Sequence, residues 1–561
     1  MSGAQPMARG PKYRAAGPHD GKRLSFWRVL LAVVVVAVVA AVAVFGFQIF
    51  VVDQARAGGA APWFAGYVDA TVTPQYAFES PESDAQADVV LSFVVAESAE
   101  ACTPSWGAAY TLDAAAQQLD MDRRIARLRQ IGGDAIVSFG GASNVELATA
   151  CTDVDDLEKA YAAVVDRYDL STIDLDIEAD DLTDAVAGQR RAEALAALQA
   201  ERRAAGTPLA VWVTLPVAQN GLTPEGEYLV TQMLAAGVDL AGVNVMTMDY
   251  GTDLGGRSMG EVAIGALEAT HTQLGELYSK AGTDLTDASL WAKLGATSMI
   301  GQNDIRGEVF GLADATELNT FGQQKQLGRL SAWSLNRDTP CGPNYLDVRT
   351  VSNQCSGVDQ EAGQFADLLS AGFGGSPSAV AAGAPQSTAT AGSTGSPTPS
   401  ATAETGPGRS TDPLPDDPAT SPYPIWSLGT TYLAGSKVVW HGTVYEAKWW
   451  NLGEVPDQPV QSAGDTPWTL IGPVLPGETP YQASTLPEGT YPEWSGAAVY
   501  QEGDRVLFKG VPFVAKWWTQ GDSPAATAPD SDGSPWLALT AAQVEEIAGS
   551  ASTAVSPTPA P

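Results

Sequence analysis

Histidine is scarce in this sequence. The 561 residues include three, His19, His271 and His441, and these lie in three different segments. A Ser-His-Asp triad would have to use one of them, and a His-based zinc site would need several. The scarcity therefore argues against both chemistries and leaves carboxylates as the natural catalytic groups. We expect no metal site and no cofactor.

Basic residues are also few. Lys and Arg number 31 against 65 Asp and Glu, which gives a formal net charge of -34. An acidic field of this size repels phosphate backbones, so nucleic acid is not an expected partner. A neutral polymer would not be repelled.

An apolar run occupies residues 29–52, and Gln48 is its only strongly polar member. A membrane-crossing helix needs about 20 apolar residues, which this run provides. Residues 1–28 are basic and should stay in the cytoplasm. The pattern predicts a single-pass cell-membrane protein with its N-terminus inside and the rest of the chain extracellular. The alternative is a signal peptide cleaved near Ala57, which would make the protein secreted, although signal cores typically span about 7–15 residues.

Four cysteines are present, and none belongs to a Cys-x-x-Cys motif, which argues against a zinc ribbon or a thioredoxin-like site. The even number and the predicted export favour two disulfides. Four cysteines allow three connectivities. By proximity along the expected fold we pair Cys102 with Cys151 and Cys341 with Cys355.

Composition divides the rest of the chain. Residues 375–422 are dominated by Ser, Thr, Ala, Gly and Pro, a composition that cannot bury a core and predicts a flexible linker. A similar flexible tail is expected at 545–561. The segment before the linker, 60–374, is long enough for one large domain.

Within residues 60–374, apolar strand-like runs alternate with amphipathic helical stretches. The predicted strands are Phe64–Val68, Val89–Val95, Ala135–Phe139, Thr172–Glu178, Leu209–Leu215, Gly242–Met248, Leu290–Ala296 and Arg329–Leu335. The predicted helices include Leu112–Gln130, Val154–Asp169, Gly188–Ala204, Pro224–Ala236, Met259–Lys280 and Asp359–Ser370. This α/β alternation predicts a TIM (β/α)8 barrel.

Three acids alternate along the fourth predicted strand, Thr172–Glu178. Successive strand residues point to opposite faces, so Asp174, Asp176 and Glu178 share the face that turns into the barrel. Burial and like charges should raise the pKa of at least one carboxyl, as a general acid requires. Glu178 is nearest the mouth and is the predicted acid. A structural ion-pair network, a helix N-cap cluster and a divalent metal site are the alternatives.

This strand resembles the family-18 glycoside hydrolase motif Asp-x-x-Asp-x-Asp-x-Glu, with Ser171 in place of the first acid. Four other segments resemble the third, sixth, seventh and eighth strands of that family. They are Val137-Ser-Phe-Gly-Gly141, Asn244-Val-Met-Thr-Met-Asp-Tyr250, Leu294–Asp304, and Trp333 within Ala332–Arg337.

The resemblance implies a substrate-assisted, retaining mechanism. Glu178 would protonate the glycosidic oxygen, Asp176 would hold the acetamido N–H of the sugar, and Asp174 would tune Asp176. By the same resemblance Trp333 floors the sugar subsite, and Met246 and Asp249 line it.

One departure from the family motif concerns the acetamido carbonyl of the sugar. Met248 stands where the family has a tyrosine that binds this carbonyl. Tyr250 and Tyr67 are the candidates to replace it.

Beyond the linker the chain repeats at an offset of 68 residues. Ala447-Lys-Trp-Trp450 recurs as Ala515-Lys-Trp-Trp518, and short β-like runs predict two small all-β modules at 423–472 and 491–540. The repeats resemble family-5/12 carbohydrate-binding modules, which implies chitin as a partner.

Each repeat carries a pair of adjacent tryptophans. Neighbouring strand residues cannot both face inward, so one tryptophan of each pair should be exposed and stack on sugar rings. The pairs are Trp449 with Trp450 and Trp517 with Trp518. The better core candidates are Trp426, Trp468, Trp494 and Trp536.

These patterns together predict a membrane-anchored chitinase that hydrolyses the β-1,4 bonds between N-acetylglucosamine units. Ser171 and Met248 motivate an alternative, a non-catalytic surface protein that binds chitin or peptidoglycan. A third possibility is an endo-β-N-acetylglucosaminidase acting on N-glycans, against which the chitin-type repeats argue.

Overall fold

The structure is a computed structural model that describes residues 61–378, 416–524 and 535–547, with gaps at 344, 346, 461–462, 481–483, 540–542 and 545–546. The predicted segments 1–28 and 29–52, most of the linker 375–422 and most of the tail 545–561 lie outside the described residues.

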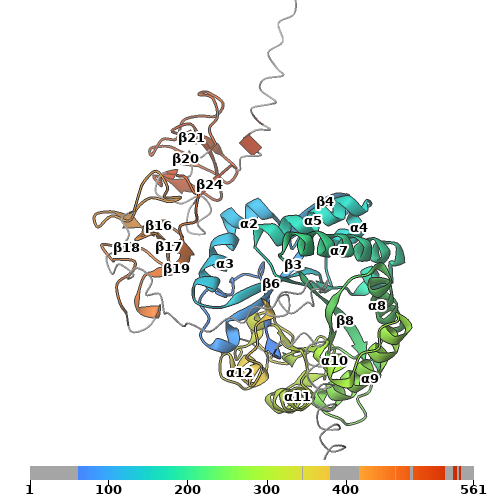
Figure 1. The fold of residues 1–561 in the computed structure, drawn as a ribbon. Helices are drawn as coiled ribbons and strands as arrows, with labels where there is room; N and C mark the ends of the chain where they lie inside the picture. Colours follow the sequence, from blue (N-terminus) through green and yellow to red (C-terminus); the bar gives the residue numbers. More distant parts are fainter. Residues whose placement is uncertain are drawn as a thin grey trace, which may run out of the picture. The chain divides into compact units, whose positions relative to one another are not determined.

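Eight parallel strands close into a barrel (Figure 1). The first wall strand is divided into β1 (Trp63–Phe64) and β2 (Gly66–Asp69). β1 pairs with β14 (Arg329–Trp333), and β2 pairs with β3 (Asp88–Ser98), so the two halves join the ends of the sheet. Between β3 and β14 lie β6 (Asp134–Gly140), β7 (Thr172–Asp176), β8 (Ala210–Ala218), β10 (Leu240–Met246) and β11 (Leu294–Met299). Each wall strand runs parallel to the next, which confirms the predicted TIM barrel.

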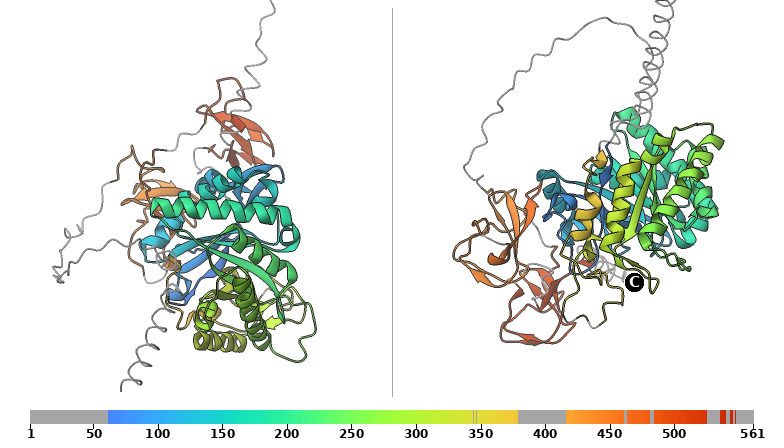
Figure 2. Two further views of the ribbon diagram at one scale, coloured as in Figure 1. Left: turned by 45° about the vertical axis from the view of Figure 1, so that its right-hand side comes forward. Right: turned by 90° about the horizontal axis from the view of Figure 1, so that it is seen from below.

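The helices follow the strands and lie outside the barrel wall, as the further views in Figure 2 also show. They are α2 (Leu112–Gln118), α3 (Met121–Gln130), α5 (Val154–Arg167), α7 (Ala185–Ala205), α8 (Pro224–Ala236), α9 (Met259–Lys280), α11 (Leu312–Lys325) and α12 (Gln364–Ser370). Shorter elements are η1 (Asp84–Gln86), β4 (Ala101–Trp106), β5 (Tyr110–Thr111), α4 (Leu147–Ala150), α6 (Ala179–Thr183), β9 (Gly221–Leu222), α10 (Asp287–Ala292), β12 (Gly301–Gln302), β13 (Val309–Phe310) and η2 (Leu335–Arg337).

The predicted secondary structure needs correction in three places. The single helix predicted over Leu112–Gln130 is two helices, because Asp120 adopts a left-handed conformation with φ 49° between α2 and α3. The strand predicted over Leu290–Ala296 begins inside α10, and β11 starts only at Leu294. Helix α11 was not predicted, since its sequence carries no continuous apolar stripe.

The two faces of the wall strands pack into two separate cores. Ile173, Leu175 and Ile177 face outward into the large cluster that the helices cover. A smaller cluster fills part of the barrel interior and contains Trp63, Ala65, Tyr67, Val90, Ile136 and Trp212. The interior is therefore mainly aromatic where it is apolar, and the remaining interior space goes to polar side chains.

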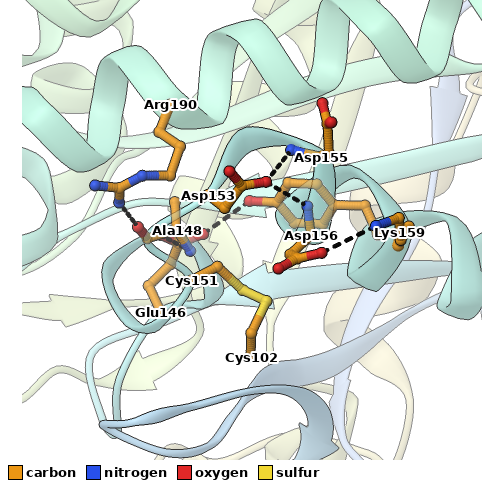
Figure 3. The surroundings of a disulfide bond; sticks show 10 residues. Cys102, Glu146, Ala148, Cys151, Asp153, Asp155, Asp156, Lys159 and Arg190 are labelled. Atoms are coloured by element: carbon orange, nitrogen blue, oxygen red, sulfur yellow. Dashed lines mark hydrogen bonds and ion pairs between the residues drawn. A yellow bond between two sulfur atoms is a disulfide. The ribbon is translucent and has the colours of Figure 1, made fainter.

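Two disulfides form with the predicted connectivity. Cys102 in β4 bonds to Cys151, the residue that ends α4, with their Cα atoms 4.6 Å apart (Figure 3). Cys341 bonds to Cys355 in the segment after β14, with their Cα atoms 5.0 Å apart. The bonds confirm the pairing chosen among three connectivities.

The two C-terminal repeats have the same order of strands. The first contains β15 (Thr431–Tyr432), β16 (Lys437–Trp440), β17 (Thr443–Ala447), β18 (Asn451–Leu452), η3 (Ala463–Asp465) and β19 (Trp468–Pro473). The second contains β20 (Val499–Tyr500), β21 (Arg505–Phe508), β22 (Val511–Ala515), β23 (Thr519–Gln520) and β24 (Trp536–Ala538). In each module a three-stranded antiparallel sheet accompanies a two-stranded one, so both are all-β as predicted.

The predicted single-pass membrane localisation is corrected. A crossing needs about 20 apolar residues, whereas the long described helices α7 and α9 carry charged side chains along their length. No helix in the described ranges is long and apolar enough to span a bilayer. The segment on which the prediction rested, residues 29–52, lies outside those ranges.

Candidate functional site

The acids of strand β7 point into the barrel, as the alternation of its side chains predicts. Asp174 and Asp176 are buried in the barrel interior, and Glu178 follows the strand end, where it is half-buried at the N-terminus of α6. In register, Asp174 lies between Ser138 of β6 and Trp212 of β8. The three acids therefore run from the middle of the barrel towards its carboxyl-end mouth, where TIM barrels keep their active sites.

Asp174 accepts four hydrogen bonds, two on each carboxylate oxygen. Oδ2 accepts from the Tyr67 hydroxyl at 2.8 Å and from the Ser138 hydroxyl at 2.7 Å. Oδ1 accepts from the Thr214 hydroxyl at 2.7 Å and from Nη1 of Arg329 at 2.6 Å. A carboxylate that receives four donors is held rigidly in one position.

Asp176 has a different environment. It is 5% exposed, and its Oδ1 atom is buried without a hydrogen-bond partner in the described part of the chain. Burial raises the pKa of Asp176 well above its usual range, and the charges of Glu178 and Asp174 raise it further, while Arg329 opposes the shift. A buried carboxyl with an unpartnered oxygen is suited to hold a proton or to meet a polar group of a ligand.

Glu178 is tuned towards neutral pH. Burial raises the pKa of Glu178 to about 7, and the negative charge of Asp249 contributes. Its side chain makes no capping hydrogen bond to α6, although it occupies the N-cap position. The predicted N-cap role is therefore not what the side chain does, and the carboxyl is left available at the mouth.

An aromatic floor lies beside these acids. Trp333 ends β14 and stacks on Phe93 of β3, with ring centroids 5.5 Å apart and planes at 25°. Tyr67 meets the edge of Trp333 at 5.9 Å. The structure thus brings the predicted residues Trp333 and Tyr67 together with Asp174, and it adds Phe93, which the sequence did not single out.

The predicted residues after β10 lie at the same end of the barrel. Met246 ends β10 and is half-buried, and Asp249 follows with a positive φ of 47°. Oδ1 of Asp249 accepts from the backbone N–H of Ile305 at 2.9 Å, and burial raises the pKa of Asp249. The hydroxyl of Tyr250 is buried and has no hydrogen-bond partner among the described residues.

Sequence reasoning missed the interior polar residues that bind Asp174. Arg329 is fully buried at the start of β14, and Ser138 and Thr214 are also fully buried. The alternation of side chains along β14 could have identified Arg329, because Arg329 and Trp333 are four residues apart and therefore face the same side of the strand, the barrel interior. An arginine at an inward position of a barrel strand needs a buried acidic partner.

Both tryptophans of each module pair are exposed. The exposed fractions are 46% for Trp449, 59% for Trp450, 43% for Trp517 and 57% for Trp518. We expected exposure of one tryptophan in each pair, and both are exposed because the pairs lie after the ends of β17 and β22, where strand alternation does not apply. The cores are built instead around Trp426, Trp468 and Trp536, as predicted, while Trp494 packs against its core from a half-buried position.

Within the ranges that the structure describes, no group of three or more His, Cys, Asp or Glu side chains is arranged to hold a metal ion. This includes the acids of β7.

The two repeats match a known family model. Residues 425–469 and 493–537 each match carbohydrate-binding module family 5/12. The match agrees with the predicted resemblance and with the exposed aromatic pairs.

Two curated proteins are similar to a larger part of the chain. A probable bifunctional chitinase/lysozyme of Escherichia coli (strain K12) is 39% identical over 290 residues, which is 50% of this chain and 31% of the relative. Endochitinase 11 of Metarhizium anisopliae is 38% identical over 268 residues, 46% of this chain and 49% of the relative. This chain thus spans half or less of the length of these relatives.

A solved structure is also similar. The catalytic domain of a hyperthermophilic chitinase from Pyrococcus furiosus is 29% identical, and the match covers 56% of this chain and 98% of that one with a TM-score of 0.48.

Proposed function

We propose that this protein hydrolyses the β-1,4 bonds between N-acetylglucosamine units of chitin. The observation that carries the proposal is the placement of Glu178, whose pKa is raised to about 7, beside the buried Asp176 at the barrel mouth. A carboxyl that keeps its proton near neutral pH can protonate a leaving oxygen. The names of the curated relatives and the match to carbohydrate-binding modules support the choice of polymer.

The proposed reaction is substrate-assisted and retains the anomeric configuration. Glu178 gives its proton to the glycosidic oxygen as that bond breaks, and the sugar's own acetamido oxygen attacks the anomeric carbon. Asp176 accepts the acetamido N–H and stabilises the positive charge of the resulting oxazolinium. Glu178, now a carboxylate, takes a proton from water as the water opens the ring. Trp333 supports the apolar face of the sugar, and Met246 and Asp249 line the subsite.

Tyr250 is a better candidate than Tyr67 to bind the acetamido carbonyl of the sugar, the role of the tyrosine that stands in the family where this chain has Met248. The hydroxyl of Tyr67 is already engaged with Asp174 at 2.8 Å and with Nη2 of Arg329 at 3.0 Å. The hydroxyl of Tyr250 is buried and unpartnered in the described residues, so it retains a donor for an acetamido carbonyl.

The modules would hold the enzyme on its insoluble substrate. Flat aromatic faces stack on sugar rings, and two linked copies bind a polymer with higher avidity than one. The two exposed pairs, Trp449 with Trp450 and Trp517 with Trp518, support this role. The proposed functional boundaries are 60–374 for the catalytic domain and 423–472 and 491–540 for the modules.

The test is release of soluble oligosaccharides from colloidal chitin by the full chain. We expect release by the natural protein and a loss of about 10²–10⁴-fold in kcat for Glu178→Gln, because the proton donor is removed. Glu225→Gln makes the same chemical change at an exposed position in α8 and should leave the rate unchanged.

Other outcomes would favour the alternatives. Binding to chitin without release at any pH would support a non-catalytic binding protein. Release of glycans from a glycoprotein while chitin stays intact would support an endo-β-N-acetylglucosaminidase.

A further inference from the structure

Arg329 is a buried cation that the proposed reaction does not use directly. We propose that Arg329 is a positioning residue: its buried ion pair with Asp174 completes the donor set of that carboxylate and so leaves Asp176 and Glu178 as the acids that exchange the proton of the site. The inference rests on the proposed function and deepens it.

Each of the three nitrogen atoms of the Arg329 guanidinium donates a hydrogen bond. Nη1 donates to Oδ1 of Asp174 at 2.6 Å, Nη2 donates to the Tyr67 hydroxyl at 3.0 Å, and Nε donates to the Ser331 hydroxyl at 2.8 Å. Both side chains of the Arg329–Asp174 ion pair are completely buried. The pair is therefore shielded from salt and water, and its geometry is fixed from three sides.

Aromatic rings complete the enclosure. The guanidinium carbon lies 5.1 Å from the ring centroid of Trp63, 5.5 Å from that of Tyr67 and 5.6 Å from that of Trp212. These rings come from β1, β2 and β8, and their faces attract a cation. The charged or titratable groups that face Arg329 are thus Asp174 and Tyr67, with Asp176 further along β7.

The consequence for the acids follows from their unequal partners. Asp174 has four donors, including this cation, whereas Asp176 has an oxygen without any partner in the described residues. A proton on Asp174 would have to displace a donor, whereas a proton on Asp176 displaces none. The proton of this strand therefore resides on Asp176 or Glu178, next to the position of the scissile bond.

The first experiment measures kcat of the full chain on soluble chito-oligosaccharides against pH. Arg329→Met removes the cation and lets Asp174 compete for the proton. The acidic limb of the profile, where kcat falls towards low pH, should therefore move up by about 1 to 3 pH units. Arg329→Lys keeps the charge and should restore most of the natural profile. Arg191→Met is the matched control, because Arg191 is equally buried and is paired with Glu146 outside the site. It should lower stability without moving the acidic limb.

The double variant Asp174→Asn/Arg329→Met decides whether the shift depends on Asp174. If Arg329 acts through Asp174, removing the carboxylate should abolish the effect of Arg329→Met on the acidic limb. An unshifted limb in Arg329→Met, or the same shift in the double variant, would overturn the inference.

A second measurement needs no activity and covers the case in which the proposed function itself fails. In Arg329→Met the buried carboxylate of Asp174 loses its cation, and a buried charge without its partner destabilises the folded state. Stability should then decline as pH rises, more steeply than in the natural protein. Melting temperatures should show this slope, and the double variant should lack it. Equal slopes in all three proteins would refute the role of Arg329, whatever the substrate.

Discussion

At the scale of single residues, the site works by giving neighbouring carboxyls unequal surroundings. Asp174 is saturated with donors, Asp176 is buried with an unpartnered oxygen, and Glu178 is half-buried near the charge of Asp249. Environments that separate the pKa values of adjacent acids are typical of acid–base catalysis. The chemistry thus depends on the partners of each acid more than on the number of acids.

The raised pKa of Glu178 sets the pH dependence. Its proton is present below pH of about 7 and is lost above it, so kcat on soluble oligosaccharides should fall as pH rises through about 7. The measurement is a pH–rate profile from about pH 4 to 9.

Asp249→Asn provides the directional check on this pH dependence. Removing the charge that helps to raise the pKa of Glu178 should move the basic limb to lower pH. A flat profile to pH 9, or an upward shift in Asp249→Asn, would contradict the assigned proton donor.

The sequence was informative about the acids and much less about their partners, of which it singled out Tyr67. Period-two alternation on one strand is a local property, so it placed Asp174, Asp176 and Glu178 on a common face. The bond from Arg329 to Asp174 joins residues 155 positions apart and exists because β14 closes against β1 across the barrel. A partner of this kind depends on closure and register, which no local pattern encodes.

At the scale of elements, the contact between β6 and β7 holds Asp176 in place. Gly140 ends β6 with φ +97°, and a Cβ atom there would lie 2.1 Å from the carbonyl oxygen of Asp176. The adjacent Gly141 N–H donates to the same oxygen at 2.8 Å. These glycines belong to the third-strand motif, and their small size allows the two strands to approach closely.

Gly140→Ala should therefore impair catalysis by displacing the backbone of Asp176. A shift of about 1 Å can cost about 10²-fold in rate, so we expect a loss of that order in kcat with a smaller change in KM. Gly206→Ala is the control, since Gly206 ends α7 with φ +80° and a Cβ atom there meets nothing within 4 Å. Equal kcat values in the two variants would argue against a role for this contact.

Element boundaries were predictable where local capping is strong. Helices α8 and α9 match their predicted ranges, because Thr223 and Ser258 cap their N-termini and Gly237 ends α8 in a left-handed conformation. The break at Asp120 was not predictable in the same way, since a left-handed aspartate has no distinct sequence pattern.

At the scale of the whole molecule, two copies of one binding module accompany one barrel. The exposed aromatic pairs support polymer binding by both copies, and linkage should make their effects combine as avidity. Adsorption of the full chain to insoluble chitin measures this directly.

Trp450→Ala or Trp518→Ala alone should weaken adsorption moderately, and the double variant should weaken it by a further 10²-fold or so. Hydrolysis of soluble oligosaccharides should be unchanged in all three variants. Tyr228→Ala is the control, because Tyr228 is 52% exposed on α8 and belongs to neither module. Unaltered adsorption in the double variant would exclude these rings from polymer binding.

The small cores of the two modules have a consequence for the effect of heat. Each module packs around small clusters of buried side chains, and the chain's four cysteines all lie in the barrel segment. Domains of this size without crosslinks are only marginally stable. On warming, the modules should therefore unfold before the barrel does, and a chain adsorbed through them would be released from a solid surface while its barrel remained folded.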